Sequence, residues 1–248
     1  MTLARLFLIL ILACSGMLQA EESDRGDIRI IADEWPPITG SQLTRGGFSV
    51  QLAIEVLQAL GYSVSIEFAP WKRIMRTSKR GEYDLITAMW KDESRESKFE
   101  FTKGYYNNKV VFVSLKDQSF QYRKASDLSD KRVGIVSSYA YPKAFLDTPA
   151  VTWDKSIDLN QSLKKVLGNR LDVAVGTEDV MRYEAQQLEG ADRLYYDVSH
   201  PIEVRSLHMG VNRQYAQHEK LVKQLDQMIQ AFKQSGRFDQ IKKQHGLM

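Results

Sequence analysis

Apolar residues follow two periodicities that alternate along the chain. Short apolar runs and alternations predict strands at 28–31, 64–68, 85–88, 133–136, 173–175, 194–196 and 207–211. Apolar residues spaced three or four positions apart predict helices at 48–60, 71–78, 159–167, 178–188 and 221–232, with a short helix after Gly236. Because strands separated by helices of this length pair in parallel, the pattern predicts an α/β protein with sheets covered on both faces.

The strand-and-helix pattern occurs twice. One set precedes the segment 107–116 and a second set follows it, which predicts two α/β lobes. The chain has no short-period repeat and no low-complexity tract, so the sequence argues against a solenoid or a long disordered linker.

The first twenty residues have the pattern of a secretory signal peptide. Arg5 precedes the apolar run 6–13, which is short for a membrane span, and small residues lead to Ala20. Cleavage after Ala20 would give a periplasmic protein that begins at residue 21. The alternative is a lipoprotein anchored through Cys14, since "ILAC" loosely matches a lipoprotein processing site, although Leu12 is unusual there.

Composition narrows the class of protein further. Cleavage after Ala20 would remove the only cysteine, so the exported protein would have no disulfide. The net charge would fall from +3 to +2 because Arg5 is lost, and charges of both signs are interspersed, so nucleic acid is not an expected partner. No later segment reaches eighteen consecutive apolar residues, so no second membrane anchor is predicted.

Motifs of common enzymes are missing. The sequence contains no G-x-S-x-G, no H-E-x-x-H, no Walker loop and no G-x-G-x-x-G. The four histidines lack metal-ligand spacing, and adjacent acids such as Asp92 and Glu93 rarely face each other as a catalytic pair. We therefore expect a binding protein with no cofactor and no metal. An exported enzyme remains an alternative, because catalytic triads assemble in space rather than in sequence.

A series of motifs runs in order along the chain. The first half has an aromatic-x-Pro loop in IRIIADEWPPITG (28–40), a Gly-Phe-x-x-x-Leu helix in GGFSVQLAIEVLQALGYSVSIEF (46–68), a Pro-Trp helix in PWKRIMRTSKRGEYDLITA (70–88) and an arginine segment in RESKFEFTKGYY (95–106). The second half has DLSDKRVGIVSS (127–138), GNRLDVAVGTED (168–179) and a closing helix (232–244). Together they resemble the bacterial periplasmic solute-binding proteins, family 3, which serve ABC transporters for polar amino acids.

The resemblance implies a two-lobed periplasmic binding protein fold of type II. Each lobe would be a mostly parallel sheet flanked by helices, and two hinge strands would join the lobes. Lobe 1 would contain residues 21–108 plus 205–248, and lobe 2 residues 109–204. The hinge would lie near 107–109 and 203–205. The expected partner is the permease of an ABC transporter, which would receive the ligand from a monomeric receptor that closes around it.

The resemblance also assigns ligand contacts in the first lobe. Arg95 aligns with the family arginine that grips the α-carboxylate of the ligand, and a guanidinium can donate two parallel hydrogen bonds to a carboxylate. The alternative is a surface arginine paired with Glu93 or Glu96. Trp35 and Trp71 match positions that lie against the ligand, with core packing as the alternative, and Trp90 at the end of a predicted strand is a third aromatic candidate.

In the second lobe the pattern departs from the family. Ser138 and Tyr139 stand where backbone N–H groups would meet an anion, although Ser138 could equally be a helix cap. Thr177 replaces the acid that usually holds the ligand ammonium, and Glu178 could substitute only if the loop shifts. Asp92 stands where the family commonly has threonine.

These residues support one leading hypothesis about function and one alternative. The leading hypothesis is a periplasmic protein that captures a small carboxylate-bearing ligand, such as a polar amino acid, for uptake by an ABC transporter. The alternative is a sensing or accessory module of the same fold that signals to a partner without transport.

Overall fold

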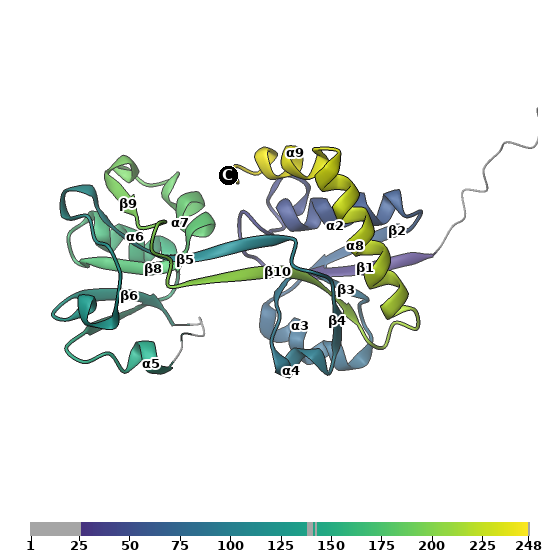
Figure 1. The fold of residues 1–248 in the computed structure, drawn as a ribbon, viewed down its shortest axis with the longest axis horizontal. Coiled ribbons are helices and arrows are strands. Elements are labelled where there is room, and N and C mark those ends of the chain that lie inside the picture. Colours follow the sequence, from purple (N-terminus) through teal and green to yellow (C-terminus); the bar gives the residue numbers. More distant parts are fainter. Residues whose placement is uncertain (1–25, 138–140, 142, 248) are drawn as a thin grey trace, which may run out of the picture.

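A computed structural model of the protein describes residues 26–137, 141 and 143–247. The expected signal peptide (1–20), the alternative lipid anchor at Cys14 and the site residues Ser138 and Tyr139 lie outside the described residues. Figure 1 shows two α/β bodies side by side, with two long strands running between them.

The strands form one continuous sheet in the order β2-β1-β3-β10-β5-β8-β6-β7, with β4 beside β10 and β9 beside β5. Their bounds are β1 Asp27–Ala32, β2 Ser63–Phe68, β3 Leu85–Trp90, β4 Phe99–Phe101, β5 Tyr106–Leu115, β6 Arg132–Val136, β7 Thr152–Ser156, β8 Val173–Thr177, β9 Leu194–Tyr196 and β10 Glu203–Asn212. The α-helices are α2 Phe48–Ala59, α3 Trp71–Thr77, α4 Glu93–Glu96, α5 Lys143–Leu146, α6 Leu159–Leu167, α7 Glu178–Ala185, α8 His218–Gln234 and α9 Arg237–Gln244.

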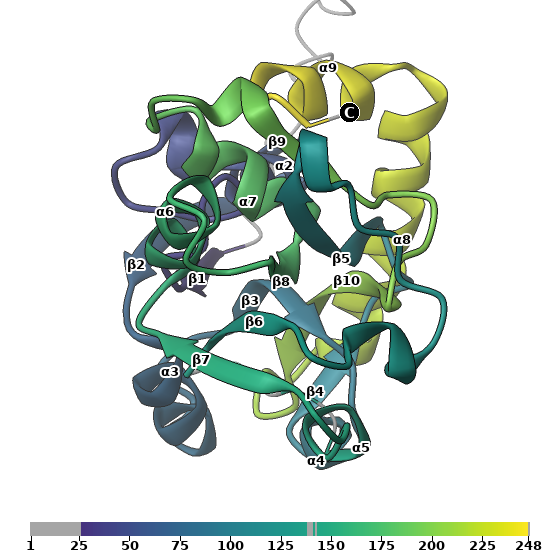
Figure 2. The ribbon, with the colours of Figure 1, turned by 90° about the vertical axis from the view of Figure 1, so that its left-hand side faces the viewer.

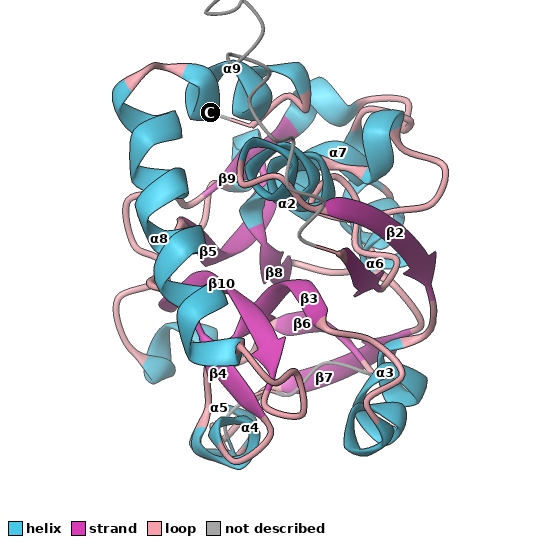
Figure 3. Cartoon of the chain, turned by 90° about the vertical axis from the view of Figure 1, so that its right-hand side faces the viewer, coloured by secondary structure: helices cyan, strands magenta, loops and turns pink. Residues whose placement is uncertain are grey.

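Each body contains a block of parallel strands. Strand β1 pairs in parallel with β2 and β3, and β6 pairs in parallel with β7 and β8. Helices lie on both faces of each block: α2, α8 and α9 on one face of the first block and α3 on the other (Figures 1 and 3). The predicted fold class, a two-lobed periplasmic binding protein fold with mostly parallel sheets, is confirmed.

The same arginine–aspartate contact recurs in the two bodies. At the start of β1, the Arg29 side chain donates to both carboxylate oxygens of Asp84, at 3.0 and 2.8 Å. At the start of β6, Arg132 donates to both oxygens of Asp172, at 3.2 and 2.8 Å. In each case the arginine backbone N–H also donates to the aspartate. Since Asp84 directly precedes β3 and Asp172 directly precedes β8, the contacts tie β1 to β3 in the first body and β6 to β8 in the second. The two halves of the sequence therefore build equivalent units.

An antiparallel ribbon of β5 and β10 crosses between the two bodies (Figure 1). Figure 2 views the molecule from the side of the second body, with β6 and β7 in front. The crossing pairs are Glu203–Val110, Val204–Lys109, Arg205–Asn108, Ser206–Asn107 and Leu207–Tyr106. Further along, β5 pairs with β8 and β9, while β10 pairs with β3 and β4. The ribbon therefore continues into the sheet of each body.

The apolar core is divided in the same way. One large cluster packs α2, α8 and α9 on β1, β3 and β10 and includes Phe48, Leu52 and Leu225. A separate cluster packs α6 and α7 on β5 and β8. Trp35 is the aromatic residue that packs against both clusters, so it links the two bodies beside the ribbon.

The structure differs from the sequence-based elements mainly near the crossing. Residues 107–116, expected to separate two lobes, are largely the central strand β5, and β10 begins at Glu203 rather than at residue 207. Polar residues at 107–109, 203, 205 and 206 interrupt the apolar pattern there because both strands are partly exposed between the bodies. The short elements β4, β7, α4 and α5 have no clear periodicity and were not predicted.

Candidate functional site

Trp35 lies in the loop that follows β1. Its backbone N–H donates to the Thr39 carbonyl at 2.9 Å and its carbonyl accepts from the Thr39 N–H at 3.1 Å, which closes a tight loop. The Trp35 ring meets the Trp90 ring edge to face, with centroids 5.4 Å apart and an interplanar angle of 89°. The favourable geometry of this pair holds both indoles at the end of the parallel strands.

Arg95 lies on α4, directly after β3. Its Nη1 donates to the Trp90 carbonyl at 2.6 Å, and its Nε lies 2.8 Å from an oxygen of Asp92. The guanidinium carbon sits 5.1 Å from the centroid of the Trp71 ring, so the cation covers one face of that indole. Burial lowers the pKa of Arg95, Asp92 raises it, and Arg205 lowers it. An arginine nevertheless stays protonated at any physiological pH.

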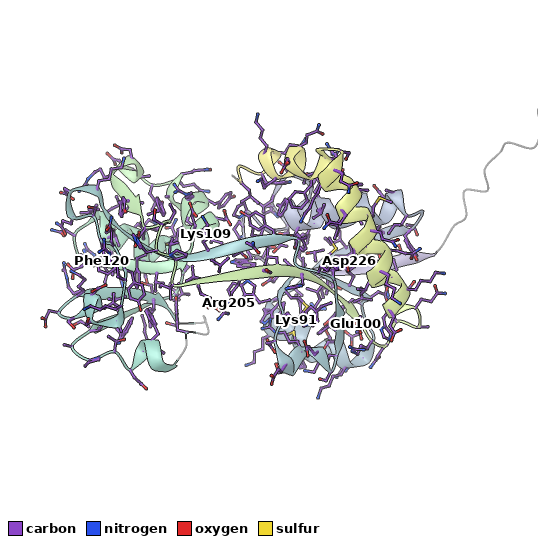
Figure 4. All side chains as sticks on the ribbon, viewed as in Figure 1. Lys91, Glu100, Lys109, Phe120, Arg205 and Asp226 are labelled. Atoms are coloured by element: carbon purple, nitrogen blue, oxygen red, sulfur yellow. The ribbon has the colours of Figure 1, made fainter. Side chains whose placement is uncertain are left out.

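A hollow of about 420 Å³ opens beside Arg95. Its lining comes from the end of β3, from α4 and from the β10 side of the ribbon: Trp90, Lys91, Asp92, Arg95, Glu203, Arg205, Ser206 and His208. Figure 4 shows Arg205 below the ribbon in the space between the two bodies. Arg95 therefore faces a recess next to the crossing strands rather than open solvent, and its side chain is 21% exposed.

The cations of this hollow are paired with acids. Arg95 pairs with Asp92, Arg205 pairs with Glu203 at 2.6 Å, and Lys91 pairs with Glu96 at 2.8 Å. The Arg205 guanidinium also covers the Trp90 ring at 4.5 Å. A ligand that enters meets guanidinium and carboxylate groups side by side on indole surfaces, which suits a molecule that carries both signs of charge.

A larger hollow, of about 780 Å³, lies on the opposite side of the ribbon. It is bounded by α7, by the loop before α2 and by the end of α9, and its lining includes Lys109, Glu178, Asp179 and Arg182. Figure 4 shows Lys109 on this β5 side of the ribbon. Glu178 pairs with Arg182 at 2.8 Å here, so the structure places Glu178 in a different hollow from Arg95.

Asp179 connects α7 to the ribbon. One carboxylate oxygen accepts from the Tyr106 hydroxyl at 2.9 Å and from the Asn108 amide at 3.2 Å. Burial raises the pKa of Asp179, and these two hydrogen bonds act in the opposite direction. The contacts fix the start of α7 on β5.

Thr177 ends β8 and is 2% exposed. Its hydroxyl oxygen is buried and has no hydrogen-bond partner among the described residues. Close by in the same body, the Tyr141 hydroxyl accepts from the Val136 N–H at 3.1 Å and donates to the Val175 carbonyl at 3.4 Å, across the ends of β6 and β8. These two hydroxyls mark the carboxyl ends of the second parallel block, where α/β sheets bind ligands.

Asp33 is a partly buried acid beside the Trp35 loop. Burial raises its pKa to about 6, although hydrogen bonds from its own backbone and from Thr39 oppose the shift. The folded protein therefore holds a proton between about pH 4 and pH 6 that the unfolded chain has released, and stability falls as the pH rises through this window. The cost reaches about 3 kcal/mol above pH 6.

Replacing Asp33 by asparagine is expected to remove this pH dependence. Between pH 4 and pH 8, the free energy of unfolding of the wild type should fall by about 3 kcal/mol relative to the variant. Urea titrations at several pH values measure the difference. The control is Asp117→Asn, an exposed acid that does not contribute to the pKa of Asp33. Parallel pH profiles for Asp33→Asn and the wild type would contradict the assignment.

Two further properties concern the whole described chain. Among residues 26–137, 141 and 143–247, His, Cys, Asp and Glu form no group of three or more that could hold a metal ion. In the same part of the chain, none of the helices combines the length and the apolar character that a membrane span needs.

Four of the residues near the hollow beside Arg95 are candidates from the sequence, whereas Asp92 and Arg205 are not predicted as ligand contacts. Trp35, Trp90, Arg95 and Trp71 form a connected chain of contacts in the first body. Asp92 was noted only as a departure from the family, and Arg205 only as a hinge residue. The spacing Asp92-x-x-Arg95 is that of an N-cap and the third residue of a helix, and this signal could have indicated their contact.

Comparison with known proteins decides the family. The sequence model of the bacterial extracellular solute-binding proteins, family 3, matches residues 28–248. The chain belongs to this family. The family-3 assignment agrees with the motifs in both halves of the sequence and with the paired α/β bodies.

Individual relatives of this family-3 protein are distant. A probable histidine-binding protein from Campylobacter jejuni is 24% identical over 143 residues, which cover 57% of this chain and 55% of that protein. The chain thus spans about half of that relative. An ancestral cationic amino acid solute-binding protein has a similar fold, with a TM-score of 0.73 at 19% identity over 89% of this chain and 96% of the other. A histidine kinase sensor domain similar to periplasmic binding proteins has a TM-score of 0.68 at 16% identity, over 90% and 96%.

Proposed function

We propose that this family-3 protein captures a small carboxylate-bearing solute, an amino acid, between its two bodies. Arg95 would hold the carboxylate and Trp90 would form a wall of the hollow. Trp35, which packs on Trp90, and Trp71, which packs on Arg95, lie outside its lining and would contact the solute only when the bodies close. One observation carries the proposal. Arg95 is largely buried in a recess beside the crossing ribbon, where it already stacks on one of these indoles and keeps three of its five N–H donors free of partners among the described residues.

Capture would involve closure of two lobes. Lobe 1 would be residues 21–108 plus 205–248 and lobe 2 residues 109–204, with bending at 107–109 and 203–205. These two segments pair with each other where the ribbon crosses between the bodies. Because the bodies have separate cores, the lobes can rotate as units while a few residues of the ribbon absorb the change.

The biological role would be uptake. An exported monomer, released after cleavage at Ala20, would deliver its solute to the permease of an ABC transporter. The probable histidine-binding relative supports an amino acid as the solute class. Thr177, at the end of β8, would contribute from lobe 2, and so would Ser138 and Tyr139, which lie outside the described residues.

Signalling is the second candidate. The similar histidine kinase sensor domain shows that this fold also serves receptors. In that case, the closed form would bind a membrane partner instead of a permease. Permease genes next to this one would favour uptake, and an adjacent sensor kinase gene would favour signalling. In either role the chain would bind its ligand without turning it over, and conversion of a bound amino acid would instead indicate an enzyme.

A thermal-shift screen tests the proposal directly. The protein is heated with each standard amino acid, with organic acids and with polyamines, and a ligand that binds only the folded state raises the melting temperature. We expect a rise with one or a few amino acids, of a size that corresponds to about 3 kcal/mol at 100 times the dissociation constant. A rise only with polyamines or other ligands that lack a carboxylate would refute the proposal.

A further inference from the structure

The candidate site lacks an acid at the position where the family holds the ligand ammonium. That position is Thr177, whose hydroxyl is buried, and the neighbouring Glu178 is paired with Arg182 in the larger hollow on the other side of the ribbon. The hollow beside Arg95 has two carboxylates in its lining, Asp92 and Glu203. An ammonium bound there needs one of them, because a buried cation without a partner is costly.

Asp92 is held in place by its own helix. It is the N-cap of α4, and one carboxylate oxygen accepts from the Arg95 backbone N–H at 3.2 Å and from the Ser94 hydroxyl at 2.5 Å. The other oxygen lies 2.8 Å from Arg95 Nε. The side chain is still 44% exposed, so the carboxylate can accept further hydrogen bonds from the hollow.

Arg95 keeps donors free on its two terminal nitrogens. A guanidinium has five N–H donors. Nε faces Asp92 and one Nη1 donor faces the Trp90 carbonyl, which leaves one donor on Nη1 and two on Nη2 without a partner among the described residues. A carboxylate can accept from these donors without displacing Asp92.

We propose that Arg95 and Asp92 together recognise the two charged groups of an α-amino acid, with Arg95 on the carboxylate and Asp92 on the ammonium. This inference rests on the proposed function. The two groups of the ligand share one carbon atom, so their partners must be adjacent, as Asp92 and Arg95 are. The ammonium partner thus comes from lobe 1 rather than from the start of α7.

The pair also determines selectivity. A carboxylate without an ammonium would lie close to the negative charge of Asp92 with nothing to compensate it, and like charges placed together are unfavourable. An α-amino acid brings its own positive charge to Asp92, which makes a charge-assisted hydrogen bond. The site should therefore prefer an amino acid to the same molecule without its α-amino group.

Calorimetry on matched ligands and variants tests the inference. The probes are L-histidine with 3-(imidazol-4-yl)propionate, L-arginine with 5-guanidinopentanoate, and L-glutamine with glutaramate. The key variant is Asp92→Asn, since asparagine caps a helix as well as aspartate does and so preserves α4. The matched control is Glu93→Gln, the same loss of charge at an exposed neighbour. Glu203→Gln tests the other carboxylate of the hollow.

We expect the wild type to bind at least one amino acid about tenfold more tightly than its des-amino partner. In Asp92→Asn, affinity for that amino acid should fall about tenfold while affinity for the des-amino acid rises, so that the preference disappears. Glu93→Gln and Glu203→Gln should keep the preference.

Three results would overturn the inference. Asp92→Asn could keep the preference for the amino acid. Asp92→Asn could instead bind the amino acid and the des-amino acid more tightly by the same factor. Finally, Glu203→Gln could be the variant that loses the preference. In each case, loss of both ligands in Arg95→Ala would still support the proposed function, so the two failures can be told apart. If no probe of any pair binds the wild type, the amino acid class and this inference fail together.

Discussion

Replacing Arg95 by alanine is expected to lower affinity for the solute at least 100-fold and to leave the protein folded. The variant loses the donors that face the carboxylate, and removal of one partner of a buried, hydrogen-bonded charge pair costs about 3 kcal/mol or more. The fold should tolerate the change because the lost contacts are few and local: the ion pair with the exposed Asp92, the hydrogen bond to the Trp90 carbonyl and the contact with Trp71 contribute about 1 kcal/mol each. Calorimetry measures the affinity, and circular dichroism with urea unfolding measures the fold.

Arg73→Ala is the matched control for this prediction. Arg73 lies on α3, pairs with Glu67 at 2.9 Å and is half exposed, so the substitution removes the same charge outside the hollow. Arg95→Lys adds a second comparison, since lysine keeps the charge but lacks the planar fork. Unchanged affinity in a folded Arg95→Ala protein would disprove the role of Arg95. Equal losses in Arg73→Ala would show that general charge, rather than this contact, controls binding.

Much of the fold could be predicted from the sequence because, in α/β proteins, the spacing of apolar residues follows the buried face of each helix and strand. Phe48, Leu52 and Val56 recur at four-residue intervals, and all three are fully buried on one face of α2. The crossing ribbon was harder to predict. Strand β5 combines exposed polar residues at 107 and 109 with a fully buried run at 111–115, so no single period describes it.

The site was less predictable than the fold, since side-chain pairing depends on direction as well as position. Glu178 was a candidate ligand contact because it adjoins Thr177 in sequence. As the first residue of α7, it instead faces Arg182 one turn later, a spacing that favours ion pairs on a helix. Trp90 ends β3 opposite Leu207, so its ring shares one face of the sheet with Leu207 and with Arg205, two residues earlier on β10. This neighbour is a consequence of strand register, which a single strand does not reveal.

The link between the Trp35 loop and α2 depends on Gly47. This N-cap residue has φ 92° and ψ 174°, a conformation that side chains strongly disfavour. Instead of a side-chain cap, the first helical N–H groups donate to loop carbonyls: Phe48 to Pro37 at 3.1 Å and Ser49 to Ile38 at 2.9 Å. A Cβ at position 47 would lie 2.8 Å from the Ile38 carbonyl oxygen. Backbone atoms cannot move aside as a flexible side chain can.

We therefore expect Gly47→Ala to destabilise the protein by about 3 kcal/mol or more, as the sum of backbone strain and the clash with Ile38. Gly236→Ala is the control. Gly236 has φ 78° and ψ 0°, and its Cβ would meet nothing within 4 Å, so only the left-handed conformation is penalised, by about 1 kcal/mol. Urea unfolding measures both values. Equal losses in the two variants would mean that the close approach of Gly47 to the loop does not hold α2 and Trp35 together.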